Sequence, residues 1–291
     1  MEDKEVQALI QLLDDPNYEI FSAVKSQLLA KGLDIIPILE STWEDDTSDL
    51  IQERIEEIIH ELQFEKTVKL LKQWVQQENK SILEGAYIIA HYQYPDINLD
   101  DIKAQTEKLK SDTWLEINEN LTALEKVKII NHIVYSAHKF TRNSADLFNP
   151  LNYYINEVLS IKKGSSILLG IIYLHIAEQL QLPIHGVDLP KNFILAYKDE
   201  FADLFPTQIY DNDGILFYIN PFNKGSVFGK KEIEHFLKQH KIEEKKEYYL
   251  PAKPERIIQR LVAELMYAYE QKGNKSKQED LMIFLEILNN K

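Results

Sequence analysis

Apolar residues recur at helical spacing along the first 110 residues. The first such stripe comprises Val6, Leu9, Ile10, Leu12 and Leu13, and Asp14-Asp15-Pro16-Asn17 ends it. The same periodicity predicts further helices over residues 18–31, 33–43, 50–62 and 68–75. Gly32 follows the second helix at the position that glycine favours after a helix end. This part of the chain is predicted to be a helical bundle.

The rest of the chain mixes helical and strand patterns. Residues 167–180 are apolar on nearly every side, so this helix must be buried all round. Strand composition recurs three times after it, at residues 183–187, 193–197 and 215–219. Other helices are predicted over residues 102–115, 121–138, 232–238, 256–272 and 278–288. We therefore expect a mostly α protein with an α+β core, in which a central helix precedes a small antiparallel sheet.

Three short motifs lie in order around these elements. Gly164-Ser165-Ser166-Ile167-Leu168-Leu169 opens the apolar helix, Pro190-Lys191-Asn192-Phe193 leads into a strand, and Ile219-Asn220-Pro221-Phe222 ends another. Their order and spacing resemble the SirB-like branch of the transglutaminase-like superfamily. Its motifs read roughly Gly-x-Pro/Cys-Ile-Ser-Leu, Pro-x-His-Phe and Ile-Asp-Pro-Phe. Residues 148–159 also resemble the Asn-Pro-x-Asn-Ser-Tyr-Leu segment of that branch, so the resemblance covers most of the chain and implies a papain-like core.

The resemblance implies that all three catalytic residues are replaced. Ser166 stands where the superfamily has its nucleophilic Cys, Asn192 where it has His, and Asn220 where it has Asp. A helix dipole stabilises an anion by at most about 2 kcal/mol, or about 1.5 pKa units at 1.36 kcal/mol per unit. Ser166 would therefore need a general base, and neither asparagine can take a proton or stabilise an imidazolium. We predict that these positions are catalytically inert.

Other residues around the motifs have two interpretations. Ser165 and Ser166 are typical helix caps, and Asn192 and Asn220 are typical turn residues. Alternatively, the two asparagines line a surviving pocket, shared with residues around Pro150, namely Asn149, Asn152, Tyr153 and Asn156.

Two histidines are candidate bases for Ser166. His185 lies in the next strand, where the pleat can point it either way. His175 lies nine residues after Ser166, on roughly the opposite helix face, and is predicted to be a core histidine.

The chain is predicted to have three domains. Residues 1–118 form a helical region, in which the helices between Leu12 and Leu39 resemble one HEAT-type hairpin. Residues 119–250 form the degenerate transglutaminase-like core. Residues 251–291 form a helical hairpin, turned at Gly273-Asn274, that looks like part of a tetratricopeptide unit of the kind SirB-like proteins often carry at this end.

Composition narrows the classes of function. Cysteine is absent, which excludes disulfides, thiolate metal sites and a cysteine nucleophile. The eight histidines have no zinc-binding spacing, so neither a metal nor a cofactor is expected. The net charge of −14 disfavours nucleic acids and acidic membranes. No apolar run reaches a membrane span of ~18–20 residues, and the acidic start is unlike a signal peptide, so a cytoplasmic protein is expected.

These observations lead to three hypotheses. The first is a non-catalytic regulatory or scaffold protein, a pseudoenzyme that binds a protein or peptide partner. The second is a residual hydrolase or peptidase that uses Ser166. The third is a sensor for a small polar ligand, with Asn192 and Asn220 in its pocket. The sequence leaves the oligomeric state and the partner's identity open.

Overall fold

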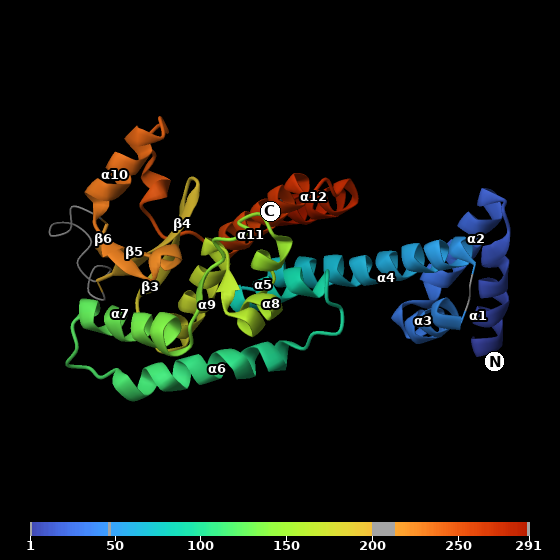
Figure 1. Cartoon of the computed structure of the whole chain (residues 1–291), viewed down its shortest axis with the longest axis horizontal. Helices are drawn as coiled ribbons and strands as arrows, with labels where there is room; N and C mark the ends of the chain where they lie inside the picture. The colour runs from blue at the N-terminus through green and yellow to red at the C-terminus, as the bar shows by residue number, and fades with distance from the viewer. Residues whose placement is uncertain (1, 46–47, 200–212, 290–291) are drawn as a thin grey trace. The chain divides into compact units, whose positions relative to one another are not determined.

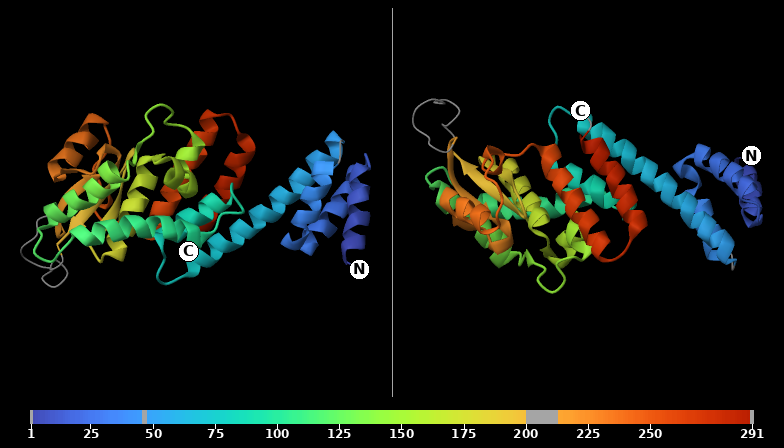
Figure 2. Two further views of the ribbon diagram at one scale, coloured as in Figure 1. Left: turned by 60° about the horizontal axis from the view of Figure 1, so that its bottom comes forward. Right: turned by 90° about the horizontal axis from the view of Figure 1, so that it is seen from above.

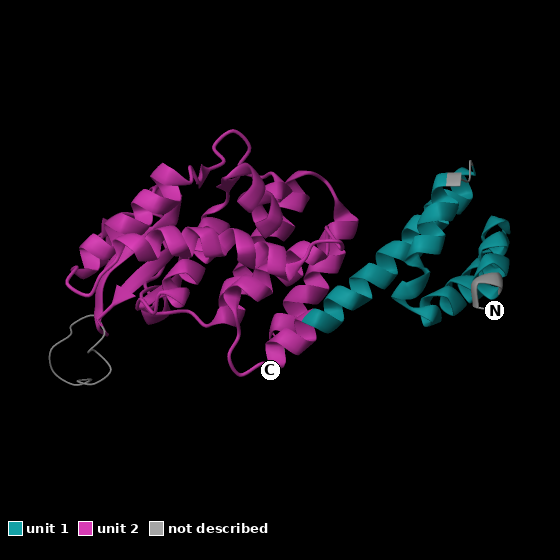
Figure 3. Ribbon diagram, turned by 90° about the horizontal axis from the view of Figure 1, so that it is seen from below, with its two compact units in different colours: residues 1–70 teal, residues 71–291 magenta. Residues whose placement is uncertain are grey.

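The computed structural model describes residues 2–199 and 213–289, apart from residues 46–47 (Figure 1). They fall into two compact units, residues 1–70 and residues 71–291 (Figure 3). The predicted boundaries at residues 118 and 250 both lie inside the second unit, and the three-domain division stays a prediction. Of the described helices, none is long and apolar enough to cross a membrane.

The first unit is a small helical bundle. Its elements are α1 (Glu2–Gln11), α2 (Tyr18–Lys31), α3 (Ile36–Asp45) and the first part of α4 (Asp49–Gln76). The Asn17 side chain caps α2 by accepting from the Glu19 N–H. Gly32 ends α2 with a φ of 75°, at the helix end that the sequence predicts. The apolar stripes meet in one core, whose fully buried members include Leu13, Leu28, Leu39, Ile55 and Ile58.

Helix α4 corrects one prediction. The apolar periodicity predicts two separate helices over residues 50–62 and 68–75, but the structure has one continuous helix of 28 residues. The five intervening residues, Gln-Phe-Glu-Lys-Thr, include neither glycine nor proline. Without a residue that breaks the backbone hydrogen-bond ladder, an irregular apolar pattern does not end a helix.

The second unit is built around α9 (Ser166–Gln179). Ten of its residues are buried, as its apolar pattern predicts. Helices α5 and α6 pack on it from one side and the sheet packs on it from the other (Figure 2). The helices of this unit besides α9 are α5 (Ile82–His91), α6 (Leu99–Glu116), α7 (Ala123–Asn131) with the π turn His132–Ala137, α8 (Ile155–Ile161), α10 (Lys230–Gln239), α11 (Pro254–Gln271) and α12 (Lys275–Asn289).

A small antiparallel sheet completes the second unit and confirms the predicted fold class. Its strands run in the order β3 (Ile184–Leu189), β4 (Asn192–Lys198), β5 (Ile215–Asn220) and β6 (Ser226–Phe228). One face packs on α9, and the other carries Val187, Ile194 and Tyr218 against Ile233 and Leu237 of α10. Two further short strands, β1 (Thr141–Arg142) and β2 (Lys163–Gly164), pair in parallel just before α9.

Glycine allows α9 to approach β4 closely. A Cβ atom at Gly170 would lie 2.5 Å from Cε1 of Phe193, which is fully buried. Gly170 is therefore a site of close packing between helix and strand. This contact holds the N-terminus of α9 beside the start of β4, where two of the three sequence motifs meet.

Candidate functional site

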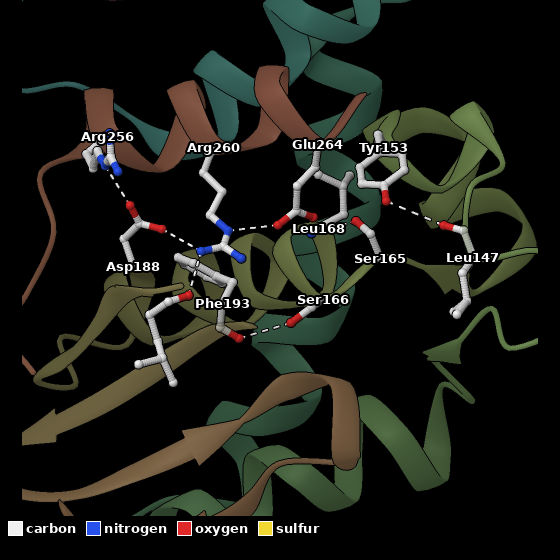
Figure 4. Close-up of polar contacts among 11 residues, drawn as sticks. Leu147, Tyr153, Ser165, Ser166, Leu168, Asp188, Phe193, Arg256, Arg260 and Glu264 are labelled. Carbon is white, nitrogen blue, oxygen red and sulfur yellow. Dashed lines mark hydrogen bonds and ion pairs between the residues drawn. The ribbon is translucent and has the colours of Figure 1, made fainter. Parts of the chain in front are cut away.

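The start of α9 presents two serines in different roles. Ser165 is the N-cap, and its hydroxyl oxygen accepts from the Leu168 N–H at 3.4 Å. Ser166 is the first helical residue, and its hydroxyl donates to the Phe193 carbonyl at 3.0 Å (Figure 4). The predicted capping role therefore belongs to Ser165, whereas Ser166 ties the helix start to β4.

The two asparagines at the other motif positions lie on neighbouring strands. In the β4–β5 register Leu195 pairs with Ile219, which places Asn220 opposite Ile194 and makes it a diagonal neighbour of Asn192 on the same face of the sheet. Diagonal neighbours of this kind lie about 7–8 Å apart. The Asn220 carboxamide oxygen accepts from the N–H groups of Phe222 at 3.0 Å and Asn223 at 3.2 Å. Asn220 thus caps the turn that follows its strand, as the structural interpretation predicts.

A cavity of about 630 Å³ opens at the start of α9. Five of the residues singled out from the sequence line it, namely Ser165, Ser166, Asn192, Asn152 and Tyr153. The other five, Asn149, Asn156, His175, His185 and Asn220, are not among its lining residues. Asn149 instead caps the short turn Pro150–Tyr153, where its oxygen accepts from the Leu151 N–H. Most ligand sites fall between about 300 and 1,000 Å³, so this cavity has the size of a binding site.

Asn152 and Tyr153 hold the loop that forms one wall of the cavity. The Asn152 carboxamide is 1% exposed, donates to the Asp146 carbonyl at 2.7 Å and accepts from the Asn143 carboxamide at 2.9 Å. The Tyr153 hydroxyl donates to the Leu147 carbonyl at 3.4 Å (Figure 4). Burial raises the pKa of Tyr153 above its usual range. Both side chains therefore shape the wall through their own hydrogen bonds.

A charged network joins the opposite wall to the sheet. Asp188 of β3 accepts from Arg256 Nε at 2.5 Å and from Arg260 Nη1 at 2.6 Å, and Arg260 Nε donates to Glu264 at 2.7 Å (Figure 4). Arg260 also donates to the Leu189 carbonyl at 2.7 Å. These bonds fix α11 on the edge of β3, so that one face of α11 becomes the cavity wall.

Burial gives this network its electrostatic character. The side chains of Arg260 and Asp188 are only 12% and 13% exposed. Burial lowers the pKa of Arg260, but its neighbours Glu264 and Asp188 outweigh that effect and raise it overall. Burial likewise raises the pKa of Glu264, against the opposing effect of Arg260. Charges held this way cannot be removed singly without leaving a buried partner uncompensated.

Apolar side chains surround the mouth of the cavity. Phe148 from the loop and Tyr267 from α11 meet edge to face with ring centroids 5.5 Å apart, and both are more than 40% exposed. Leu147 and Phe222 lie on the same lining, and the Arg142 guanidinium sits 5.4 Å from the Phe222 ring centroid. An apolar lining with a few placed polar groups is the usual arrangement of a binding pocket.

The wall from α11 is the part that sequence reasoning missed. The helix itself was predicted, as was the hairpin that it makes with α12, but Arg256, Arg260, Glu264 and Tyr267 were not predicted as site residues. They recur at intervals of three or four residues, which places them on one helix face. The sequence signal for this wall was a polar stripe of two arginines and a glutamate, on a helix face adjacent to the apolar face.

The chemistry within reach of Ser166 is limited. Its hydroxyl proton is directed at a peptide carbonyl, which is not a base at neutral pH. Asn192 and Asn220, at the other two motif positions, both carry carboxamides, which do not act as bases near neutral pH. Over the residues that the structure describes, no cluster of three His, Asp or Glu side chains could hold a metal ion.

Comparisons with known proteins agree with this architecture. A family model described as the transglutaminase-like superfamily matches residues 99–263, which is more than half of the chain. The F-box only protein 21 of Homo sapiens is 30% identical over 240 residues, covering 74% of this chain and 37% of that protein. This chain thus spans little more than a third of the length of that relative. No solved structure matches.

Bacterial relatives are similar over shorter stretches. The UPF0162 protein of Xylella fastidiosa is 26% identical over 170 residues, covering 57% of this chain and 54% of that protein. The UPF0162 protein of Buchnera aphidicola is 32% identical over 140 residues, covering 48% and 46%. The chain is homologous to these proteins, and it belongs to the transglutaminase-like superfamily.

Proposed function

We propose that this protein is a non-catalytic member of its superfamily, a regulatory or scaffold protein that holds a protein or peptide partner in the cavity at the start of α9. The observation that carries the proposal is that a 630 Å³ cavity persists beside Ser166 and Asn192. None of the three motif positions carries a thiol, an imidazole or a carboxylate. A cleft that is kept without its reactive groups retains the capacity to bind.

Three features support a pseudoenzyme. The three motifs resemble those of the SirB-like branch, and this resemblance puts Ser166, Asn192 and Asn220 at the catalytic positions. The Ser166 hydroxyl has a peptide carbonyl as its acceptor. His185, one of the two histidines considered as a base for Ser166, is not among the residues that line the cavity.

The competing hypothesis is a hydrolase or peptidase that uses Ser166, and covalent labelling separates the two. We expect no adduct when the intact chain is incubated with a fluorophosphonate and analysed by intact-mass spectrometry, because Ser166 lacks a base to remove its proton. Ser166→Ala is the matched control. An adduct on the wild type that is absent from Ser166→Ala would contradict the proposal and identify an activated serine.

The proposal that the cavity binds a peptide is tested by filling the cavity with a larger side chain. Ala263 is exposed on α11 and lines the cavity, so Ala263→Trp fills the space without disturbing the core. Peptides selected from a random display library on the wild-type chain are expected to lose binding to Ala263→Trp. Selected peptides that bind both chains equally would show that the cavity is not the binding site.

A sensor for a small polar ligand is less well supported by the cavity. The carboxamide of Asn152 and the carboxamide oxygen of Asn220 already have partners in the protein. The HEAT-like nature of the first unit, the tetratricopeptide-like nature of the α11–α12 hairpin and the cytoplasmic location all stay predictions that belong with this proposal.

A further inference from the structure

Three cavities of the second unit meet at one side chain. Arg256 lines the cavity of about 630 Å³ at the start of α9. It also lines a cavity of about 910 Å³ beside Lys72 and Lys253, and one of about 460 Å³ beside Tyr248. Gln259 and Asn289 also line both of the first two. The three cavities therefore adjoin one another at Arg256, and we call them together the α11 groove.

Arg256 is held in a fixed orientation, and part of its guanidinium makes no hydrogen bond within the described residues. Its Nε donates to Asp188 Oδ2, and the other oxygen of Asp188 accepts from Arg260. The Arg256 side chain is 63% exposed. Within the described residues, no hydrogen bond or ion pair engages its two terminal nitrogens. A guanidinium that is oriented in advance and retains two parallel donors suits a carboxylate, which it can bind in a bidentate manner.

The α11 groove is locally basic in an acidic chain. Three lysines line it besides Arg256, namely Lys72, Lys191 and Lys253. Of the acidic residues on the same lining, Asp188 and Glu264 bind arginines, and Glu255 pairs with Lys80 at 3.2 Å. Glu247 is the remaining acidic residue among those that line the groove. With Arg260, the lining carries five basic side chains against four acidic ones, in a chain whose net charge is −14, so it favours acidic ligands by charge complementarity.

The spacing of the groove sets the length of its ligand. Arg256 and Tyr267 both line the first cavity on the same face of α11. They are eleven residues apart, which at 1.5 Å per residue is about 16 Å along the helix. An extended peptide rises about 3.3 Å per residue, so about five residues span that distance. The apolar mouth at Phe148 and Tyr267 lies at the other end of this span.

We propose that the α11 groove binds an extended acidic peptide segment. This inference rests on the proposed function and defines its ligand. The Arg256 guanidinium clamps an Asp or Glu side chain of the peptide. A bulky apolar side chain about five residues away enters the mouth between Leu147, Phe148 and Tyr267.

The test uses the full chain and a displayed library of random twelve-residue peptides. Wild-type selection is expected to enrich Asp or Glu four to six positions from Phe, Tyr, Trp or Leu. The affinity of a selected peptide is expected to fall at least tenfold, equal to about 1.4 kcal/mol, in both Arg256→Gln and Arg256→Glu. Lys128→Glu makes the same charge change as Arg256→Glu at an exposed position of α7 and should change affinity less than twofold.

A charge swap gives the sharpest readout. Selection on Arg256→Glu is expected to replace the acidic position of the peptides by Lys or Arg. Arg256→Gln retains an amide donor for Asp188, so it serves if Arg256→Glu fails to fold, as judged by circular dichroism. The inference would be overturned if the selected peptides have no acidic position and bind Arg256→Gln as tightly as they bind the wild-type chain.

The outcomes distinguish this inference from the proposed function. Selected peptides that lack an acidic position but fail to bind Ala263→Trp would refute the acidic ligand and leave the cavity as a peptide site. Peptides that bind Ala263→Trp unchanged, or no enrichment on the wild type, would refute both. Equal losses in Arg256→Glu and Lys128→Glu would mean long-range electrostatics rather than a clamp at Arg256, and would overturn the inference.

Discussion

At the scale of single residues, the hydrogen bond of Ser166 fixes the start of α9 on β4. The first turn of α9 faces β4, and the hydroxyl makes a hydrogen bond there. The acceptor is a peptide carbonyl, however, so the bond positions the side chain without activating it. The helix dipole alone is too weak to ionise an alcohol.

This reading of Ser166 can be tested by restoring the residues of the superfamily. Because the chain has no cysteine, Ser166→Cys introduces a single reporter thiol. Adding Asn192→His is expected to lower the thiol pKa by one unit or more, because an adjacent imidazolium stabilises a thiolate. The measurement is the rate of iodoacetamide alkylation as a function of pH in the single and double variants.

The neighbouring serine provides the matched control for the reporter. Ser165 is 6% exposed and caps α9, so the thiol introduced by Ser165→Cys should respond little to Asn192→His. A larger response at position 165 than at position 166 would move the nucleophile position by one residue. An equal thiol pKa in both Ser166→Cys variants would show that Asn192 does not occupy the base position.

Some of the residues that line the cavity could be named from the sequence, and others could not, for a physical reason. Ser166 and Asn192 were found because short motifs keep their spacing around one helix and one strand. Arg260 meets Asp188 across 72 residues of chain. The periodicity of α11 shows which of its faces is apolar, but it does not show which distant strand its polar face will meet.

At the scale of elements, the contact between α9 and β4 determines where the cavity lies. Gly170 lets the fully buried Phe193 ring pack directly on the helix backbone. The long elements around this contact were predicted because their apolar patterns extend over many residues. Strands β1, β2 and β6 have only two or three residues each, too few for an alternating pattern to be recognised.

Gly170→Ala tests whether this close packing outweighs helix propensity. Alanine favours a helix by about 1 kcal/mol over glycine, whereas overpacking a core costs about 1–3 kcal/mol. The Phe193 ring is fully buried and also packs closely on Gly186, so we expect a net loss of about 1 kcal/mol in the free energy of unfolding. Urea denaturation monitored by circular dichroism measures it.

The same substitution should change sign in a background with a smaller side chain at position 193. In Phe193→Leu, the added methyl group meets less bulk, and Gly170→Ala is expected to be neutral or stabilising. This double-mutant cycle isolates the helix–strand contact. Stabilisation by Gly170→Ala in the wild-type background would show that the ring yields easily and that the contact is loose.

At the scale of the whole molecule, the chain contains two compact units with separate cores. The long helix α4 contributes to both, because its residues 49–70 belong to the first unit and residues 71–76 to the second. The sequence pattern did not find this boundary, since helical periodicity continues through it without a turn signal.

Core deletions should reveal whether each unit has its own stability. Leu39 and Leu261 are fully buried in the first and second units, and Leu→Ala at such sites costs about 2–5 kcal/mol. We expect Leu39→Ala to accelerate amide hydrogen exchange within residues 2–45 and to leave residues 166–198 unchanged. Leu261→Ala is expected to do the reverse. Acceleration throughout the chain by either substitution would mean that the two units unfold together.

The placement of one face of α11 as a cavity wall has a consequence for how such a protein diversifies. The residues that this helix presents to the cavity are one stripe of a single element, and the core around α9 does not depend on most of them. Exchanging Ala263 and Tyr267, which lie outside the charged network that fixes α11 on β3, would change the cavity lining on an unchanged scaffold. Divergence between relatives in this lining should therefore be concentrated in one helix, far in sequence from the three motifs around α9.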